Sequence, residues 1–326
     1  TLSFRLVFTE EYGPTKLEYP LFSPTSDIDS INTLILDGYW QNSLQHNNEP
    51  FALNAQYVRD ILASDLQAST GSYAVNHRYS HLYINGQYWG LYVLHERPDD
   101  AALSEHLGGE REDYDVIHNS VNDVIAGTND DLETLFNLAN GNTASSSVYA
   151  QIQQLLDVEQ FANYAVLSTW GSARDWHVNW YAARNSAADT PFQFYTWDTE
   201  LILSELSENS FGGSGSNPGG LLEDLRDNAE FRLTFADAAH RMLFNNGILS
   251  PDRAGELLEN RLTQIEDAVV LEYARWGDLR RPTNPYTVAD WEAERNQLLT
   301  DFFPDRHAIY LNQLLSVFRF ALEKLT

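Results

Sequence analysis

Cysteine is missing from the 326-residue sequence, which excludes disulfide bonds, thiol catalysis and metal sites built from thiolates. Long hydrophobic runs are missing too, since no stretch approaches the roughly 20 apolar residues that a membrane-spanning helix needs. The sequence shows no signal segment and does not begin with Met, and its first residues have the pattern of a strand. We therefore expect no membrane span in this chain, and we expect a processed product or a fragment.

Positive charge is scarce, because 20 Lys and Arg stand against 47 Asp and Glu and give a formal net charge of −27. This balance argues against nucleic acid as a partner, since neutralising phosphates requires clustered Lys and Arg. It would also repel a nucleotide unless metal ions or a local group of arginines intervene. Only two lysines occur, Lys16 and Lys324, so a mechanism that needs a lysine has few candidates.

Hydrophobic and aromatic residues are plentiful, at 43% and 13%, which predicts a folded protein with a sizeable core. Strand-like patterns dominate up to Glu96 and helical periodicity dominates after it, with no linker that separates independent domains. A hairpin is predicted over 80–96, with the turn pair Asn85-Gly86. Further strands are expected at 2–8, 33–36 and 114–117, and helices at 54–67, 99–107, 130–138, 158–170, 221–244, 251–275, 287–303 and 306–325.

A second hairpin is predicted within 172–201, where two aromatic and aliphatic runs, 178–183 and 192–197, flank a polar link. Folding this stretch near Ala188 places Asn179 opposite Trp197. The open end then gathers five polar side chains: Asp175, His177, Asn179, Asp198 and Glu200. Oxygen and imidazole groups suit a hard divalent cation such as Mg²⁺ or Ca²⁺. Polar residues also occur at strand ends simply because strands end at solvent, so the pattern alone leaves a structural interpretation open.

A glycine- and serine-rich segment follows at 208–220, about ten residues beyond Asp198. It predicts either a mobile surface loop or a flap over the site.

Between Ser3 and about Leu203 the sequence resembles the CotH family, the bacterial spore-coat-type atypical protein kinases. No single motif is decisive, but their order and spacing make a specific combination. The matching segments are SFRLVF at 3–8, YGPTKLEYPLF at 12–22, the Arg59-Asp60 pair, HLYINGQYWGLYVLHERPD at 81–99, DWHVNW at 175–180 and WDTE at 197–200. The helical C-terminal part fits the family only loosely.

The resemblance implies an α+β, protein-kinase-like bilobal fold in one domain, with 1–96 as the N-terminal lobe and 97–326 as the C-terminal lobe. The most N-terminal part of the family domain is expected to lie outside this sequence. The activity implied is transfer of the ATP γ-phosphate to Ser or Thr hydroxyls of proteins, with Mg²⁺ or Mn²⁺, or alternatively Ca²⁺. The resemblance also implies a bacterial protein that is secreted or located at the cell surface and acts on a protein substrate or on neighbouring extracellular or coat proteins.

Matching motif by motif, the resemblance implies that Asp175 is the catalytic aspartate and that Asn179 and Asp198 bind the metal. Asp175 would orient the attacking hydroxyl or accept its proton. The other two side chains would hold the cation against the phosphates.

Nucleotide contacts are expected from four residues: Lys16, Arg59, Glu96 and Arg97. The junction 95–99 would connect the lobes, with adenine bound against its backbone, although Glu96 and Arg97 could equally form an ordinary charge pair at a helix start. Lys16 would contact phosphate unless Arg5 or Arg78 does so instead.

The Arg59-Asp60 pair occupies the place of a helix that braces the lobes. Asp60 would anchor a basic residue that contacts phosphate, or it would form a simple surface ion pair.

A rival interpretation is a catalytically inactive, kinase-like extracellular module with a structural or adhesive role that binds calcium. The acidic composition favours this module, and so does Asp37, which stands where the family tends to have arginine. The presence of Asp175, Asn179 and Asp198 together favours the enzyme. A metal-dependent hydrolase is disfavoured, because no ligand spacing such as HExxH occurs.

Overall fold

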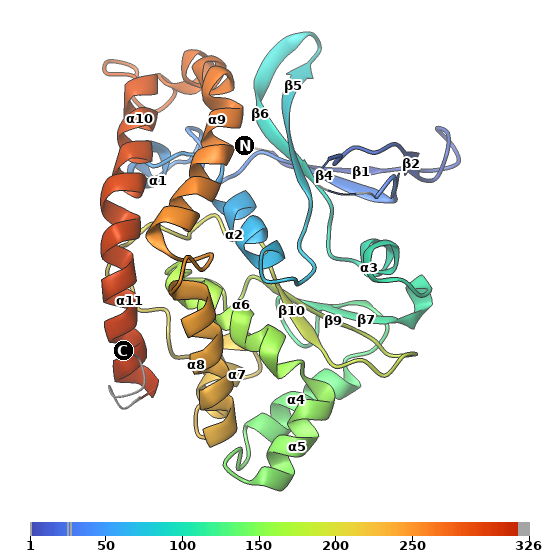
Figure 1. The fold of residues 1–326 in the computed structure, drawn as a ribbon. Helices are drawn as coiled ribbons and strands as arrows, with labels where there is room; N and C mark the ends of the chain where they lie inside the picture. The colour runs from blue at the N-terminus through green and yellow to red at the C-terminus, as the bar shows by residue number, and fades with distance from the viewer. Residues whose placement is uncertain (1, 25, 27, 319–326) are drawn as a thin grey trace.

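The computed structural model describes residues 2–24, 26 and 28–318, which form two four-stranded antiparallel sheets and a large group of helices (Figure 1). The first sheet has the order β1-β4-β6-β5 and contains β1 Phe4–Val7, β4 Thr33–Asp37, β6 Gln87–His95 and β5 His77–Ile84. The second has the order β10-β9-β7-β8 and contains β10 Gln193–Thr196, β9 Trp180–Asn185, β7 Tyr114–His118 and β8 Val124–Ala126. The short strands β2 Leu17–Glu18 and β3 Ser30–Ile31 pair separately. The predicted α+β class is confirmed.

Helices before the second hairpin are α1 Glu49–Leu53, α2 Arg59–Ala68, α3 Asp100–Leu107, the short η1 Arg111–Asp113, α4 Asp130–Ala139, α5 Ser146–Leu155 and α6 Val158–Trp170. After it come α7 Pro218–Leu225, α8 Ala229–Leu243, α9 Pro251–Trp276, α10 Val288–Gln297, the π-type turn η2 Leu298–Phe302 and α11 Phe303–Phe318. Within the described part of the chain, none of these helices has the length and apolar character needed to cross a membrane.

Local sequence signals explain several of these elements. Asn85 and Gly86 both have positive φ, 51° and 80°, as the turn predicted between β5 and β6 requires. Asp99 begins α3, because its Oδ1 accepts a hydrogen bond from Ala102 N at 3.0 Å. The register of the second hairpin pairs Trp180 with Thr196, so that the next position along brings Asn179 opposite Trp197, as predicted.

Three predicted helices need correction. The segment 221–244 is two helices, because Asn228 turns the chain and caps α8 by accepting hydrogen bonds from the amides of Glu230 and Phe231. The helix predicted over 287–303 is regular only to Gln297, and α11 begins at Phe303 rather than at Arg306. The predicted end of that last helix, together with Lys324, lies outside the described residues.

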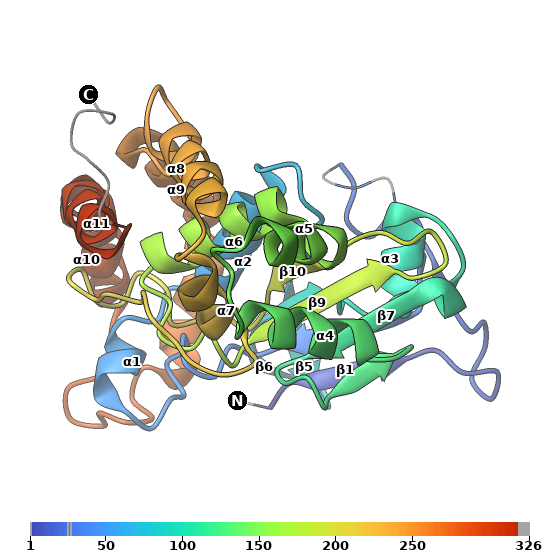
Figure 2. The same ribbon diagram turned by 90° about the horizontal axis from the view of Figure 1, so that it is seen from below.

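The core lies around α6, whose residues are almost all buried. Helix α6 contacts β10 on one side and α8 on the other (Figure 2), and Phe161 packs edge-on against Phe194 with ring centroids 5.2 Å apart. Helix α2 contacts both α6 and α9, and α9 in turn contacts β6. The predicted lobe boundary after Glu96 stays a prediction, although these contacts cross it.

Candidate functional site

A cavity of about 540 Å³ opens between the first sheet and the open end of the second hairpin. Four of the five polar residues predicted to gather there line it, whereas His177 is exposed and is not among its lining residues. The complete lining is Ser3, Ile35, Asp37, Trp40, Gln41, Asp60, His95, Asp175, Val178, Asn179, Trp197, Asp198 and Glu200.

One helical turn before β9 presents Asp175 and Asn179 together. The carbonyl oxygen of Asp175 accepts hydrogen bonds from the amides of Val178 and Asn179, at 2.8 and 2.9 Å, which places the side chains four residues apart on the same side. Asn179 Nδ2 donates to Asp175 Oδ2 at 2.8 Å and to the carbonyl oxygen of Asp198 at 3.1 Å. With Nδ2 used in this way, the amide oxygen Oδ1 of Asn179 is left to act as a ligand atom.

Asp198 follows the end of β10 and has a left-handed backbone, with φ of 51°. Asparagine and aspartate tolerate this conformation better than most residues. Preceding it, Trp197 packs edge-on against Tyr181 and His95, with ring centroids 5.2 and 5.5 Å apart. Asp198 itself is exposed at the cavity, while Thr199 and Glu200 after it are buried.

Negative charge is concentrated in this cavity. Loss of solvent, followed by the charges of Asp60, Asp37 and Asp175, raises the pKa of Asp198 to about 7. Because Asp198 is exposed, we regard the like charges as the stronger cause. Burial also raises the pKa of Asp175, and burial together with Asp37 and Asp198 raises the pKa of Glu200.

Two of these carboxylates, Asp60 and Asp37, each lie beside a histidine. Burial opposes ionisation of Asp60, but hydrogen bonding and charge from His77, together with hydrogen bonds from Thr199, outweigh it and lower the pKa of Asp60 to about 2. The Nε2 atom of His77 lies 3.8 Å from Asp60 Oδ2, and Nε2 of His95 lies 3.9 Å from Asp37 Oδ2. Burial, followed by the charge of His77, lowers the pKa of His95.

Asp37 has a structural partner that the sequence reading missed. Ser3 Oγ donates to Asp37 Oδ1 at 2.6 Å, and the amide of Tyr39 donates to the same oxygen at 3.1 Å. Glu200 Oε2 similarly accepts hydrogen bonds from the amides of Gln41 and Asn42, at 2.6 and 2.9 Å. These two carboxylates therefore fix the loop after β4 at the edge of the cavity.

The donor set fits a hard cation that is only partly held by protein. The lining offers carboxylate and amide oxygens and, among the described residues, neither Lys nor Arg. No three histidine, aspartate or glutamate side chains of the described ranges come close enough to form a complete metal site. Mg²⁺ commonly takes one or two carboxylates and completes its coordination with water and substrate phosphates. Asp198 and Asn179 would suit that arrangement.

A second cavity, of about 660 Å³, lies along the same face of the first sheet. Residues at alternate positions along a strand lie on the same face of a sheet. Ser3, just before β1, and Asp37 of β4 line the first cavity, while Arg5 of β1 and Thr33 of β4 line the second, so the two cavities lie on one face. The full lining of the second cavity is Arg5, Val7, Phe8, Thr15, Lys16, Asn32, Thr33, Arg97, Asp99, Asp100, Ala101, Arg111, Val124 and Ile125. Basic side chains are thus present here and absent from the lining of the first cavity within the described chain.

Two of the four residues predicted to contact nucleotide, Lys16 and Arg97, line this second cavity, and so does Arg5. Lys16 forms an ion pair with Glu105 of α3. The guanidinium of Arg97 donates through Nε to the Tyr181 hydroxyl at 2.5 Å.

The other two predicted nucleotide contacts lie elsewhere. Arg59 is buried and donates to the carbonyl oxygen of Ile202 at 2.5 Å and to Glu294 Oε1 at 2.6 Å. Glu96 is buried beside His106, whose Nε2 lies 3.0 Å from Glu96 Oε1. Neither side chain lines the two cavities described above.

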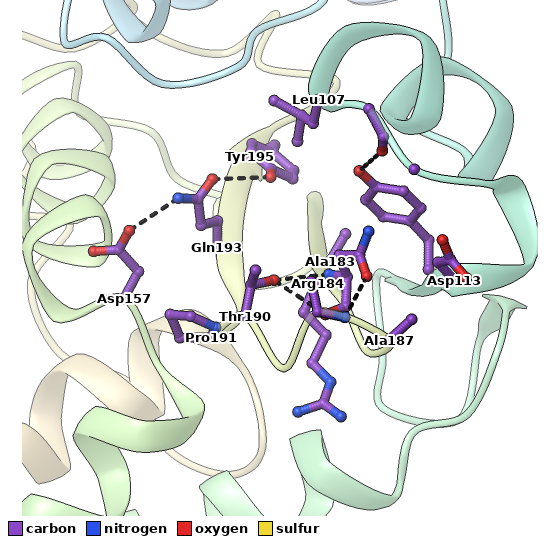
Figure 3. Close-up of a pocket in the computed structure, with 15 residues that line it drawn as sticks. Leu107, Asp113, Asp157, Ala183, Arg184, Ala187, Thr190, Pro191, Gln193 and Tyr195 are labelled. Atoms are coloured by element: carbon purple, nitrogen blue, oxygen red, sulfur yellow. Dashed lines mark hydrogen bonds between the residues drawn. The ribbon is translucent and has the colours of Figure 1, made fainter.

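A third cavity, of about 680 Å³, lies at the other end of the second hairpin, around its turn (Figure 3). Its polar side chains largely bind one another: Gln193 Nε2 donates to Asp157 Oδ2 at 2.9 Å, and the Tyr195 hydroxyl donates to Gln193 Oε1 at 3.2 Å. We therefore place no chemistry there, although it is slightly larger than the other two.

The glycine-rich segment packs closely onto α7. A methyl group on Gly220 would lie 2.1 Å from the carbonyl oxygen of Gly215, so these residues touch through their backbones. Trp176, next to Asp175, donates through Nε1 to the carbonyl oxygen of Ser210 at 3.1 Å. The start of the segment is therefore anchored beside Asp175, and its end lies near His177, whose Cβ is 3.4 Å from where a methyl group on Gly219 would be.

Comparison with known families gives one clear result. A family model described as CotH kinase protein matches residues 47–310, which is most of the chain and includes Asp60, Asp175, Asn179 and Asp198. A search of curated proteins gave no match.

Proposed function

The chain belongs to the CotH kinase protein family, and from this membership we propose that it transfers the γ-phosphate of ATP to Ser or Thr hydroxyls of a protein. The observation that carries the proposal is the pair of cavities along one face of β1 and β4, one acidic and one containing arginines. A nucleotide that spans both would place its phosphates at the carboxylates and its base beside the connection 95–99. The proposal includes a kinase-like arrangement of two lobes around these cavities.

The second cavity has a mostly polar lining with two apolar parts that would contact the base. Val7 and Phe8 on one side and Val124 and Ile125 on another supply apolar contacts, and Arg97 and Asp99 belong to the connection after β6. We assign Lys16, Arg97 and Arg5 to the ribose or the nearest phosphates.

A divalent cation held by Asp198 and Asn179 would neutralise phosphate charge that this acidic cavity otherwise repels. Asp175 has one carboxylate oxygen, Oδ2, bonded to Asn179, so that Oδ1 is left to accept the hydrogen bond of an attacking hydroxyl. Its raised pKa makes it a better proton acceptor than an ordinary aspartate. Because phosphoryl transfer depends mainly on positioning and charge neutralisation, these few groups are sufficient.

Location and substrate rest on the family alone. We propose that the protein is bacterial, secreted or at the cell surface, and that it modifies neighbouring coat or extracellular proteins. The rival function, a calcium-binding module without catalysis, is favoured by one observation: the lining of the first cavity has no Lys or Arg among the described residues.

Thermal-shift titrations separate the two functions. The kinase requires stabilisation by ATP that appears only when Mg²⁺ or Mn²⁺ is also present, whereas the module requires a response to Ca²⁺ and none to nucleotide. Labelling with γ-phosphate-labelled ATP then tests the residues. Asp198→Asn should abolish metal-dependent labelling of the folded protein, and Asp175→Ala should lose turnover but keep most nucleotide affinity.

The matched control is Asp189→Asn, because Asp189 is an exposed aspartate with a similar φ of 52° in the hairpin turn. It should label like the wild type. Undiminished labelling of Asp198→Asn would remove Asp198 from the site, and an Asp175→Ala protein that fails to fold would make Asp175 structural.

A further inference from the structure

Helix α2 holds the chain on both sides of Asp198. At its last turn, Gln67 Oε1 accepts a hydrogen bond from the amide of Thr196 at 2.9 Å. At its first turn, Asp60 Oδ1 accepts one from the amide of Thr199 at 2.7 Å and a second from the Thr199 hydroxyl at 2.6 Å. All four partners are buried. Asp198 therefore lies between two anchored positions.

The helix that provides these bonds is itself fixed in place. Asp65 forms a two-bond ion pair with Arg261 of α9, with N–O distances of 2.6 and 2.7 Å. Arg59 reaches beyond the site to the carbonyl oxygen of Ile202 and to Glu294 of α10. Helix α2 is thus a rigid support rather than a surface helix, in keeping with its almost complete burial.

Asp198 needs such support because of its backbone. Its φ of 51° lies in the left-handed region, which aspartate tolerates better than most residues but which still costs free energy unless the surroundings favour it. Relaxation to negative φ would change the direction in which the Asp198 side chain projects at the cavity that Asp175 and Asn179 also line. The bonds at Thr199, the next residue, oppose this rotation directly.

Asp60 also lines the cavity, but both of its oxygens already have partners. Oδ1 accepts the two hydrogen bonds of Thr199, and Oδ2 faces His77 Nε2 at 3.8 Å. Building on the proposed function, we propose that Asp60 is a positioning residue that holds Asp198 in its metal-binding conformation through Thr199. The sequence predicted that Asp60 anchors a basic residue or forms a surface ion pair. In the structure its Oδ1 accepts hydrogen bonds from Thr199, the residue after Asp198.

Binding of MnCl₂ alone, measured by calorimetry, tests this role without requiring catalysis. Asp60→Asn and Asp60→Ala remove the same negative charge, but only the amide keeps an oxygen that can accept from Thr199. The difference between the two variants therefore isolates the hydrogen bonds from the charge. We expect Asp60→Ala to bind Mn²⁺ about tenfold more weakly than Asp60→Asn, since losing the acceptor leaves a buried amide unpaired.

The control for general loss of stability is Asp115→Ala, which breaks the buried ion pair of Asp115 with Arg184 in the second sheet and leaves the contacts of α2 intact. It should bind Mn²⁺ within about twofold of the wild type. If Asp60→Ala does not fold, Thr199→Val and Thr199→Ser replace it: valine lacks the hydroxyl that serine keeps, and we expect about threefold weaker binding by the valine variant.

The positioning role is overturned if Asp60→Ala and Asp60→Asn both fold and bind Mn²⁺ with affinities within twofold of each other. Where Asp60→Ala does not fold, the same result for Thr199→Val and Thr199→Ser overturns it. An equal loss in Asp115→Ala overturns it as well, because the effect would then be general destabilisation. A wild-type protein that binds neither Mn²⁺ nor ATP refutes the proposed function itself, and the role of Asp60 falls with it. In an active enzyme, the metal concentration for half-maximal rate should rise in Asp60→Ala and be restored toward wild type in Asp60→Asn.

Discussion

Glu272 offers the sharpest test of how the helices are joined to the first sheet. It lies on α9 with only 1% of its surface exposed, and it accepts hydrogen bonds from the amide of Leu91, from the Tyr88 hydroxyl at 2.8 Å and from the Tyr57 hydroxyl at 3.1 Å. Its Oε1 also lies 3.2 Å from where a methyl group on Gly90 would be, so β6 approaches closely. One carboxylate therefore connects α9, β6 and the loop before α2.

Replacing Glu272 by alanine leaves these donors without an acceptor. A buried donor without a partner costs about 1–3 kcal/mol, and two of them, Leu91 N and the Tyr57 hydroxyl, are buried. We expect Glu272→Ala to lower the free energy of unfolding by about 4 kcal/mol. Glu272→Gln keeps one accepting oxygen and should lose about 1–2 kcal/mol.

The effect of pH follows from the same site. Burial raises the pKa of Glu272, and the bonds from Tyr88, Leu91 and Tyr57 offset only part of that increase. The folded state therefore binds the proton more tightly than the unfolded state, so this residue favours folding most at low pH. As pH rises from about 4.5 through the raised pKa, the wild type loses that contribution, whereas the glutamine variant does not titrate. The stability gap between them should narrow with increasing pH.

Urea unfolding at several pH values between 4 and 8 measures both quantities. Glu256→Gln is the control, because Glu256 is exposed on the same helix and pairs with Arg253 one turn away; it should change the free energy of unfolding by less than about 0.5 kcal/mol. A loss below about 1 kcal/mol in Glu272→Ala, or a gap to Glu272→Gln that widens as pH rises, would refute this account of the contact.

Three further perturbations probe other parts of the molecule. Arg306 is fully buried and donates to two backbone carbonyls at the end of α6 and to two in the segment between β10 and α7, so Arg306→Met should lower the free energy of unfolding in urea by about 3 kcal/mol, and a loss under about 1 would contradict this. Gly220→Ala should lower the melting temperature, because the added methyl group would clash with the backbone of Gly215 in the glycine-rich segment. Gly212→Ala adds a methyl group in open space at φ of 94° and should lower the free energy of unfolding by only about 1 kcal/mol. Equal melting temperatures of the two variants would show that the segment does not pack on α7. Mn²⁺ affinity should fall about tenfold between pH 8 and pH 6, because protonation of Asp198, with its pKa of about 7, competes with the cation; a pH-independent dissociation constant would argue against Asp198 as ligand.

Local pattern was enough to predict the hairpin that carries the site. Alternation and turn composition gave its register, and the spacing of Asp175 and Asn179 is that of one helical turn. Four of the five predicted polar residues line one cavity for this reason. His177 does not, because the turn between Asp175 and Asn179 directs it toward solvent, and a strand-based reading has no means of seeing that turn.

Contacts between distant segments could not be predicted in the same way. Arg59 was predicted to contact the nucleotide, yet it is buried against Ile202 and Glu294, which are 143 and 235 residues away in sequence. Periodicity shows which face of a helix is apolar but not which element covers it. The division of one expected helix at Asn228 has a local cause, since the side chain of that residue competes successfully for two backbone amides.

In the proposed enzyme, the two cavities together explain how a strongly acidic protein would bind a negatively charged nucleotide. A protein with a net charge of −27 would repel ATP at almost any surface, and the first cavity adds five carboxylates without a described Lys or Arg among its lining. The second cavity holds Arg5, Lys16 and Arg97 on the same face of the sheet. A nucleotide lying across both would meet cationic side chains at one end and, at the other, carboxylates that accept it only with a cation between them. In the proposed enzyme, nucleotide and metal binding are therefore mutually dependent, and by linkage each must strengthen the other by the same factor.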